Sequence, residues 1–141
     1  MRKERMIRIR DLQNTAEGEN GTETTAFGYL MGTANDYTLG YEEHFGDGMK
    51  SRTKITVKNQ RCASILRDGD IAGELTVEAG RRHSCRYSTP FGEMMIGVYA
   101  QDVFSSIGPK GGQLELRYTV DCNGSLVASK QMVIDVSDKM L

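Results

Sequence analysis

The densest group of reactive side chains in the sequence lies on one short stretch, which reads His-Ser-Cys-Arg-Tyr-Ser-Thr-Pro-Phe-Gly-Glu-Met-Met over residues 83–95. Alternate residues of a β-strand share a face, so His83, Cys85 and Tyr87 are expected on one side of a strand. A histidine and a thiol on one face could begin a zinc site, or form a nucleophile pair with an activated thiolate. Both chemistries need more partners or a closer contact than this spacing provides.

Zinc normally takes three or four protein ligands, and the only other histidine of the chain, His44, lies far upstream. Because they are two residues apart on a strand, His83 and Cys85 do not make the close contact that activates a thiolate. We therefore interpret the stretch mainly as a strand and a turn, with Pro90 and Gly92 at positions that suit a type I turn. The sequence predicts no metal site, no cofactor and no catalytic residue here.

Two charged residues fall on faces that are otherwise apolar. Arg67 is in phase with Ile65, and Glu43 is in phase with Tyr41. If both side chains point inward, they must be paired or serve a ligand, because an isolated buried charge is costly. The alternative, that both lie at strand ends and reach solvent, is favoured because Arg67 stands immediately before an Asp-Gly turn pair.

A sheet must position these residues, because turn signals recur about every ten to fifteen residues along the chain. Asn-Gly and Asp-Gly pairs favour type I′ hairpin turns. They occur at Asn20-Gly21, Asp47-Gly48, Asp68-Gly69 and Asn123-Gly124, and a further break is expected at Asn59-Gln60. We expect these pairs to separate short strands.

Between the breaks, apolar and polar residues alternate, as in antiparallel strands that bury one face. The residues expected to face inward include Leu114, Leu116, Tyr118 and Val120, with Met94, Ile96 and Val98, while Glu115, Arg117 and Thr119 face solvent. The expected strands are 5–13, 23–32, 37–44, 50–58, 62–68, 71–79, 82–88, 92–104, 113–122 and 126–136. Strands in sequential up-and-down order favour a closed antiparallel β-barrel of about eight to ten strands with little helix, since closure removes exposed edges. A sandwich is the alternative.

Length and charge restrict the class of protein. At 141 residues the chain is expected to form one domain, 1–141, with a single core. Eighteen basic residues nearly cancel nineteen acidic ones, and the net charge of −1 disfavours a nucleic-acid binder. The basic run at residues 1–10 is interpreted as a solvated first strand with its charges on the outer face.

The sequence also predicts a reduced compartment. The N-terminus has no apolar core of a signal peptide, and no segment has the length of a membrane span. The cysteines, Cys62, Cys85 and Cys122, are odd in number and lack a short pairing spacing. We therefore expect three free thiols in a cytoplasmic protein.

Several motifs occur in an order found in a known family. They are Tyr41-Glu42-Glu43, Arg67-Asp68-Gly69, Gly80-Arg81-Arg82-His83, Tyr87-Ser-Thr-Pro-Phe-Gly92 and Tyr118. Through them the chain resembles, over residues 5–136, the YwiB-like family of small bacterial proteins, classed as a domain of unknown function. The resemblance implies a closed, calycin-like (lipocalin-related) β-barrel in a cytoplasmic setting. It brings no established activity, substrate or cofactor, and it makes the 87–92 stretch a family hairpin rather than a chemical site.

Three functions remain open at this point. The first is a barrel that binds a small molecule in its mouth without catalysis, with Tyr41, Glu43, Arg67 and Tyr87 as ligand-binding candidates. The second is a barrel with a filled core that acts as a protein-interaction or self-association module, for example as a homodimer. The third and least favoured is an enzyme, which would use the same charged pair with Tyr87 and His83. Neither a nucleic acid nor a membrane is expected as a partner.

Overall fold

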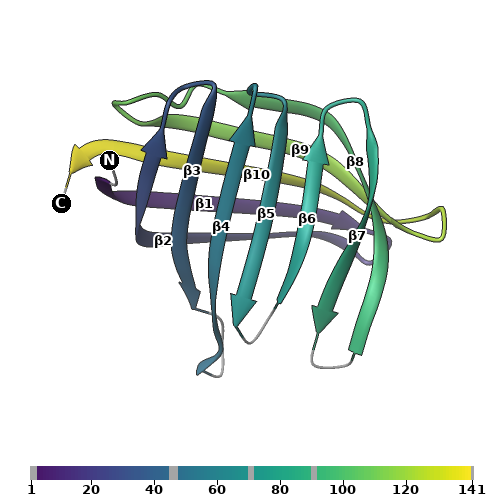
Figure 1. Ribbon diagram of the computed structural model, residues 1–141. Coiled ribbons are helices and arrows are strands. Elements are labelled where there is room, and N and C mark those ends of the chain that lie inside the picture. The colour runs from purple at the N-terminus through teal and green to yellow at the C-terminus, as the bar shows by residue number, and fades with distance from the viewer. Residues whose placement is uncertain (1–2, 45–47, 70–71, 90–91, 141) are drawn as a thin grey trace.

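Ten strands make up most of the chain in the computed structural model, which describes residues 3–44, 48–69, 72–89 and 92–140 (Figure 1). In chain order they are β1 (Lys3–Thr15), β2 (Gly18–Gly32), β3 (Asp36–His44), β4 (Lys50–Lys58), β5 (Cys62–Gly69), β6 (Ala72–Glu78), β7 (Arg82–Thr89), β8 (Gly92–Ser105), β9 (Gly112–Cys122) and β10 (Ser125–Met140). Every expected strand is present. Within the described residues, no helix has the length and apolar character needed to cross a membrane.

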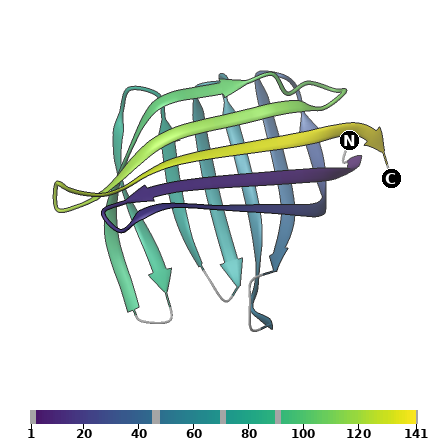
Figure 2. The ribbon, with the colours of Figure 1, turned by 180° about the vertical axis from the view of Figure 1, so that it is seen from behind.

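The strands close into a barrel, because β1 pairs with both β2 and β10 and every other strand pairs with its neighbours in sequence. All of these pairings are antiparallel, so the expected up-and-down barrel is confirmed. Figures 1 and 2 show a flattened shape, in which β3–β7 form one layer and β1, β9 and β10 run across behind it. The long strands β2 and β8 bend from one layer into the other, and in β8 the sheet register shifts between Ala100 and Asp102. Such a bulge lets a strand bend.

Two of the expected hairpin turns have the predicted geometry. Asn123 and Gly124 have φ values of 53° and 86° between β9 and β10, and Asn59 and Gln60 both have 55° between β4 and β5. Positive φ at both central positions is what a type I′ turn requires. The turn expected at Pro90 lies outside the described residues.

The turn expected at Asn20-Gly21 is wrong. These residues lie inside β2, opposite Gln13 and Leu12 of β1, and the chain reverses at residues 16–17 instead. The strands extend further than expected because Gly18 supplies the unusual backbone, with φ of 123°, directly after the reversal. A glycine adopts such a conformation without the steric cost that a side chain would impose.

The two ends of the barrel differ in how their interiors are filled. One end carries the β2–β3, β4–β5 and β6–β7 connections, and its inward side chains are packed and apolar. They include Tyr37, Val57, Ala63, Val77 and Ala100, none more than 3% exposed. At the other end, which we call the open end, β3, β5 and β7 end and β4, β6 and β8 begin. The expected inward face of β9 is confirmed, since Leu114, Leu116 and Tyr118 are at most 1% exposed.

The N-terminal basic run was expected to be solvated, but one of its arginines is buried. Arg8 and Arg10 are exposed on the outer face, but Arg5 is in phase with the buried Ile7 and is only 2% exposed itself. Its guanidinium donates to the backbone oxygens of Ser137 and Pro109. Arg5 therefore ties the start of β1 to the β8–β9 connection and to the last part of β10.

Candidate functional site

The interior near the open end contains a group of polar side chains, which we call the interior polar cluster. It consists of Asp11, Tyr41, Glu43, Arg67, Tyr87, Tyr118 and Lys130. These side chains come from six strands, β1, β3, β5, β7, β9 and β10. Barrel closure brings them together, because inward positions on distant parts of the sequence face one another across the interior.

Glu43 and Arg67 form an ion pair inside the barrel, so the interpretation that both reach solvent at strand ends is wrong. The Arg67 Nη2 to Glu43 Oε1 distance is 3.4 Å, and the side chains are 16% and 13% exposed. The Thr53 hydroxyl donates to the same Glu43 oxygen at 2.7 Å. Both residues do stand near strand ends, but their side chains take the inward phase and are largely enclosed.

A second ion pair lies across the β1–β10 seam. Lys130 Nζ is 3.7 Å from Asp11 Oδ2, and these side chains are 22% and 26% exposed. Burial raises the pKa of Asp11, although Lys130 and, more weakly, Arg67 act to lower it. For Arg67, burial acts to lower the pKa, but the negative charge of Glu43 opposes it and the pKa is raised overall. Arg67 therefore carries its charge in a largely enclosed space.

The phenols of the cluster are strongly affected by the same enclosure. Burial raises the pKa of both Tyr41 and Tyr118, so both remain protonated as hydrogen-bond donors. Three buried polar atoms of the cluster have no hydrogen-bond partner among the described residues, namely Asp11 Oδ1, Tyr41 Oη and Arg67 Nε. Buried polar groups are nearly always paired, so three unpaired atoms in one cluster are unusual.

A cavity of about 230 Å³, which we call the inner cavity, adjoins this cluster. Its walls are mainly apolar and are formed by Ile65, Leu75, Met94, Ile96, Val120, Val127, Ala128 and Met132, together with Cys122. Its polar lining residues are Gln13, Arg67, Tyr87, Tyr118 and Lys130. Met94 faces this cavity as expected, but it is 45% exposed, because it lies at the rim rather than in the packed core.

Gly73 makes room for two side chains that line the inner cavity. It is paired in register with Arg67 on one side and with Tyr87 on the other. A Cβ atom at this position would approach Tyr87 Cδ2 to 3.1 Å, tighter than most such contacts. Glycine in a strand often marks a close approach, and here it leaves room for the two large inward side chains of its neighbours.

The structure separates the reactive-looking side chains of residues 83–95. His83 Nε2 lies 2.8 Å from Glu78 Oε1, and on the outer face Arg86 Nε lies 2.9 Å from Glu93 Oε1. Among the described residues of this stretch, Tyr87 and Met94 line the inner cavity, and Tyr87 also belongs to the interior polar cluster. Within the described part of the chain, no three His, Cys, Asp or Glu side chains gather in a group that could hold a metal.

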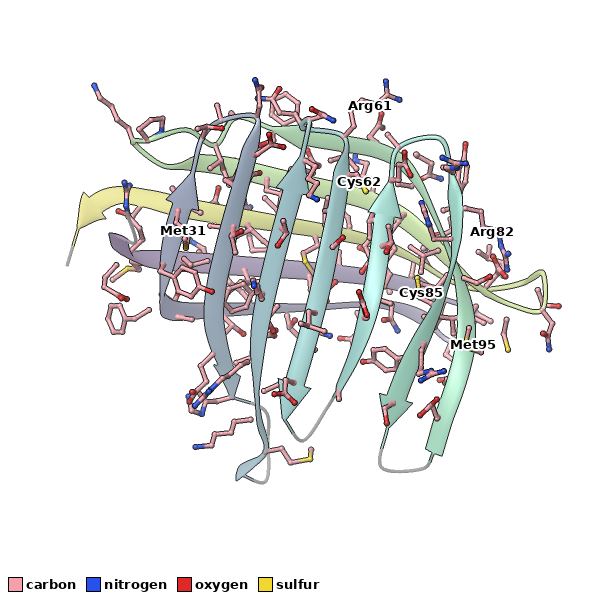
Figure 3. The ribbon with its side chains drawn as sticks, viewed as in Figure 1. Met31, Arg61, Cys62, Arg82, Cys85 and Met95 are labelled. Carbon is pink, nitrogen blue, oxygen red and sulfur yellow. The ribbon has the colours of Figure 1, made fainter. Side chains whose placement is uncertain are left out.

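Cys85 occupies a weak place in the barrel wall. Strands β6 and β7 are paired only from Ala72 to Glu74 and then diverge, and Cys85, labelled in Figure 3, lies beyond that point. Its sulfur accepts a hydrogen bond from the Thr76 backbone N–H at 3.4 Å. A thiol sulfur is a weak acceptor, so this bond only partly replaces a ladder bond. Burial raises the pKa of the Cys85 thiol, which disfavours a reactive thiolate.

The four candidates from the sequence, Tyr41, Glu43, Arg67 and Tyr87, thus lie in one cluster, and Arg67 and Tyr87 line the inner cavity directly. Sequence reasoning missed Asp11, Tyr118 as a site residue, and Lys130. The same signal that found Arg67 could have found two of them. Asp11 follows the inward Ile7 and Ile9, and Lys130 lies between the inward Ala128 and Met132, all at a spacing of two.

A second depression, of about 420 Å³, lies on the outside of the wall over β2–β5. Its floor is made by Gly28 and Gly40, and the rim includes Phe27, Tyr29 and Leu66. A Cβ atom at Gly40 would collide with the ring of Tyr29, so the glycine is needed for the tyrosine to lie flat on the strand. The charged residues of this depression, which include Glu42, Arg52 and Asp68, lie on the outer face of the sheet, and Arg67 and Lys130 are not among its lining residues.

A family model described as "Domain of unknown function (DUF1934)" matches residues 7–134. The chain belongs to this family. The predicted YwiB-like relationship is therefore confirmed, and the motifs that suggested it lie within the matched region. None of the curated proteins compared with the chain matches it.

A solved crystal structure has the same fold. The crystal structure of the ywiB protein from Bacillus subtilis superposes with a TM-score of 0.83, covering 96% of this chain and 92% of that one. The sequences are only 16% identical over this match. The barrel architecture is thus retained at low sequence identity, and the likeness carries the fold alone.

Proposed function

We propose that this member of the family binds a small molecule inside the open end of its barrel and does not act as a catalyst. The observation that carries the proposal is the inner cavity, with an apolar wall on one side and unpaired buried polar atoms beside it. Ligand sites typically combine apolar walls with a few convergent polar groups. This use of a barrel is the one common among calycin-like proteins, and we propose it for a cytoplasmic bacterial protein.

Barrel size supports the proposal. An eight-stranded barrel is just wide enough for side chains to fill or for one small ligand to enter, and the diameter grows with strand number. This barrel has ten strands. The end that carries the β2–β3, β4–β5 and β6–β7 connections is filled by apolar side chains, whereas the inner cavity remains beside the interior polar cluster near the open end. The inner cavity, at about 230 Å³, is slightly smaller than the range of about 300–1,000 Å³ that is usual for sites of drug-sized molecules, so it suits a smaller ligand.

The test is binding of the uncharged fluorescent dye N-phenylnaphthylamine, whose emission rises in apolar surroundings. We expect saturable binding to one site on the folded protein. Val120→Phe adds bulk to the cavity wall and should abolish binding, since Val120 lines the cavity and is only partly buried. Thr119→Phe is the matched control. Thr119 is the residue before Val120 on β9, and it lies on the opposite, outer face of the strand.

Two results would contradict the proposal. One is the absence of saturable dye binding to the folded protein. The other is binding that Val120→Phe leaves unchanged while Thr119→Phe removes it, which would place the dye on the outer surface. Either result would favour the second candidate function, a barrel that acts through its surface as an interaction module.

A further inference from the structure

We infer that the ligand of the inner cavity is a small anion with an apolar body, whose charged end is held between Arg67 and Lys130. This inference rests on the proposed function, because it names the ligand class for the same cavity. The inference is based on the charges that line the cavity. The interior polar cluster as a whole is nearly neutral, whereas the charged side chains that reach the cavity wall are positive.

The charged residues among the described cavity-lining side chains are both cations, Arg67 and Lys130. Their acidic partners, Glu43 and Asp11, belong to the cluster but do not line the cavity. The two carboxylates therefore neutralise the cations from behind, and a molecule in the cavity meets the positively charged side of each pair. An anion is favoured at such a surface, and a cation is opposed at close range with little water to screen it.

Both cations also retain hydrogen-bonding capacity. Their contacts to Glu43 and Asp11, at 3.4 and 3.7 Å, are longer than the 2.7–2.9 Å usual for charge-assisted hydrogen bonds. Arginine has five N–H donors and lysine has three, and Arg67 Nε is buried with no partner among the described residues. A carboxylate or similar anion can accept several hydrogen bonds at once, so it would satisfy donors that the two acidic residues leave unused.

Phenols extend the same donor surface. Tyr87 and Tyr118 line the cavity, and Tyr118 is opposite Lys130 in the β9–β10 register. The raised pKa of Tyr118 keeps its hydroxyl protonated at neutral pH. The charged end of a ligand at Arg67 and Lys130 would therefore be surrounded by donors rather than by competing acceptors.

The rest of the cavity fixes the chemistry of the ligand's body. The rest of the lining is made mainly of aliphatic side chains and methionines, which include Ile65, Leu75, Ile96 and Met132. A volume of about 230 Å³ corresponds to roughly seven or eight waters at about 30 Å³ each. A short hydrocarbon chain fits this space, and methionine at the rim adapts to irregular shapes.

The experiment compares three probes of equal chain length, sodium octanoate, octanol and octylamine, by isothermal titration calorimetry with the full chain. We expect octanoate to bind at least about tenfold more tightly than octanol, which corresponds to one good charge-assisted interaction. Octylamine should bind most weakly. Added salt should weaken octanoate binding and leave octanol binding nearly unchanged.

Four variants locate the charged end. Arg67→Met and Lys130→Met should each reduce octanoate affinity by about tenfold or more without changing octanol affinity. Arg67→Lys should retain more octanoate affinity than Arg67→Met, because it keeps the charge. Lys54→Met is the matched control: it removes a lysine from the outer face of β4 and should have no effect. Circular dichroism and thermal unfolding show whether each variant is folded. If Arg67→Met does not fold, Lys130→Met and Arg67→Lys still test the inference.

The results separate this inference from the proposed function. Equal affinity for octanoate and octanol, or a preference for octylamine, would overturn the anionic ligand and leave a binding barrel. Loss of octanoate and octanol binding together in Lys130→Met would mean that the lysine shapes the cavity rather than holding the charge, and would also overturn it. If none of the probes binds and the uncharged dye does not bind either, both proposals are wrong.

Discussion

The enclosed ion pair of Glu43 and Arg67 makes a quantitative prediction about stability. Removing one partner of a fully buried pair costs about 3–5 kcal/mol, because it leaves the other charge buried and unpaired. Here the side chains are 13% and 16% exposed, and the Thr53 hydroxyl continues to stabilise Glu43 after Arg67 is removed. We therefore expect Arg67→Met to lower the free energy of unfolding by about 2–3 kcal/mol, somewhat below the fully buried value.

The double variant distinguishes a paired charge from two independent side chains. Glu43→Gln should cost about 1–2 kcal/mol, since the amide oxygen can still accept from Thr53 while Arg67 loses its counter-charge. Arg67→Met combined with Glu43→Gln should cost less than the sum of the single changes by about 1–2 kcal/mol, because neither charge is then left unpaired. All variants should remain folded, given a typical domain stability of about 5–15 kcal/mol.

The assay is urea-induced unfolding at neutral pH, followed by circular dichroism because the chain has no tryptophan. The control cycle is the outer-face pair of Arg86 and Glu93, at 2.9 Å but with 70% and 55% of the side chains exposed. For this pair we expect a coupling below about 0.5 kcal/mol, as for solvent-exposed ion pairs. Additivity of the interior cycle to within about 0.5 kcal/mol would refute the reasoning, since it would mean that the two interior charges act independently.

Three further predictions concern the wall and the interior. Leu116→Glu should cost several kcal/mol or prevent folding, because Leu116 is fully buried, whereas Thr119→Glu on the opposite face should cost less than about 1 kcal/mol, both measured by urea unfolding. The Thr76 amide should exchange hydrogen faster than amides in the middle of the β9–β10 ladder, and faster still in Cys85→Ala, because its acceptor is a thiol sulfur; equal protection in nuclear magnetic resonance exchange would contradict this. The pKa of Asp11 is raised by burial, so its contribution to stability is fully present below the ordinary value of 3.8 and is lost as pH rises through the raised value. The unfolding free energy of the native protein minus that of Asp11→Asn should therefore fall with rising pH across this window, and a difference that rises would show that Lys130 dominates instead.

The barrel was largely predictable from local sequence patterns. Alternation of apolar and polar residues at a period of two located all ten strands, because each strand buries one face and exposes the other. Turn chemistry succeeded where positive φ is required at two successive residues, as at Asn123 and Gly124. It failed at Asn20-Gly21, because pairing between β1 and β2 continued through a sequence that would also suit a turn.

The composition of the site depended on contacts that local patterns do not contain. The sequence determined that Arg67 and Glu43 occupy inward phases, but their burial depended on how the neighbouring strands pack around the two side chains. Asp11 and Lys130 are far apart in sequence, and only closure of β1 against β10 brings them to 3.7 Å. Alternation along a strand fixes which face a side chain takes, whereas the barrel's closure and flattening decide which inward side chains meet and where a cavity remains.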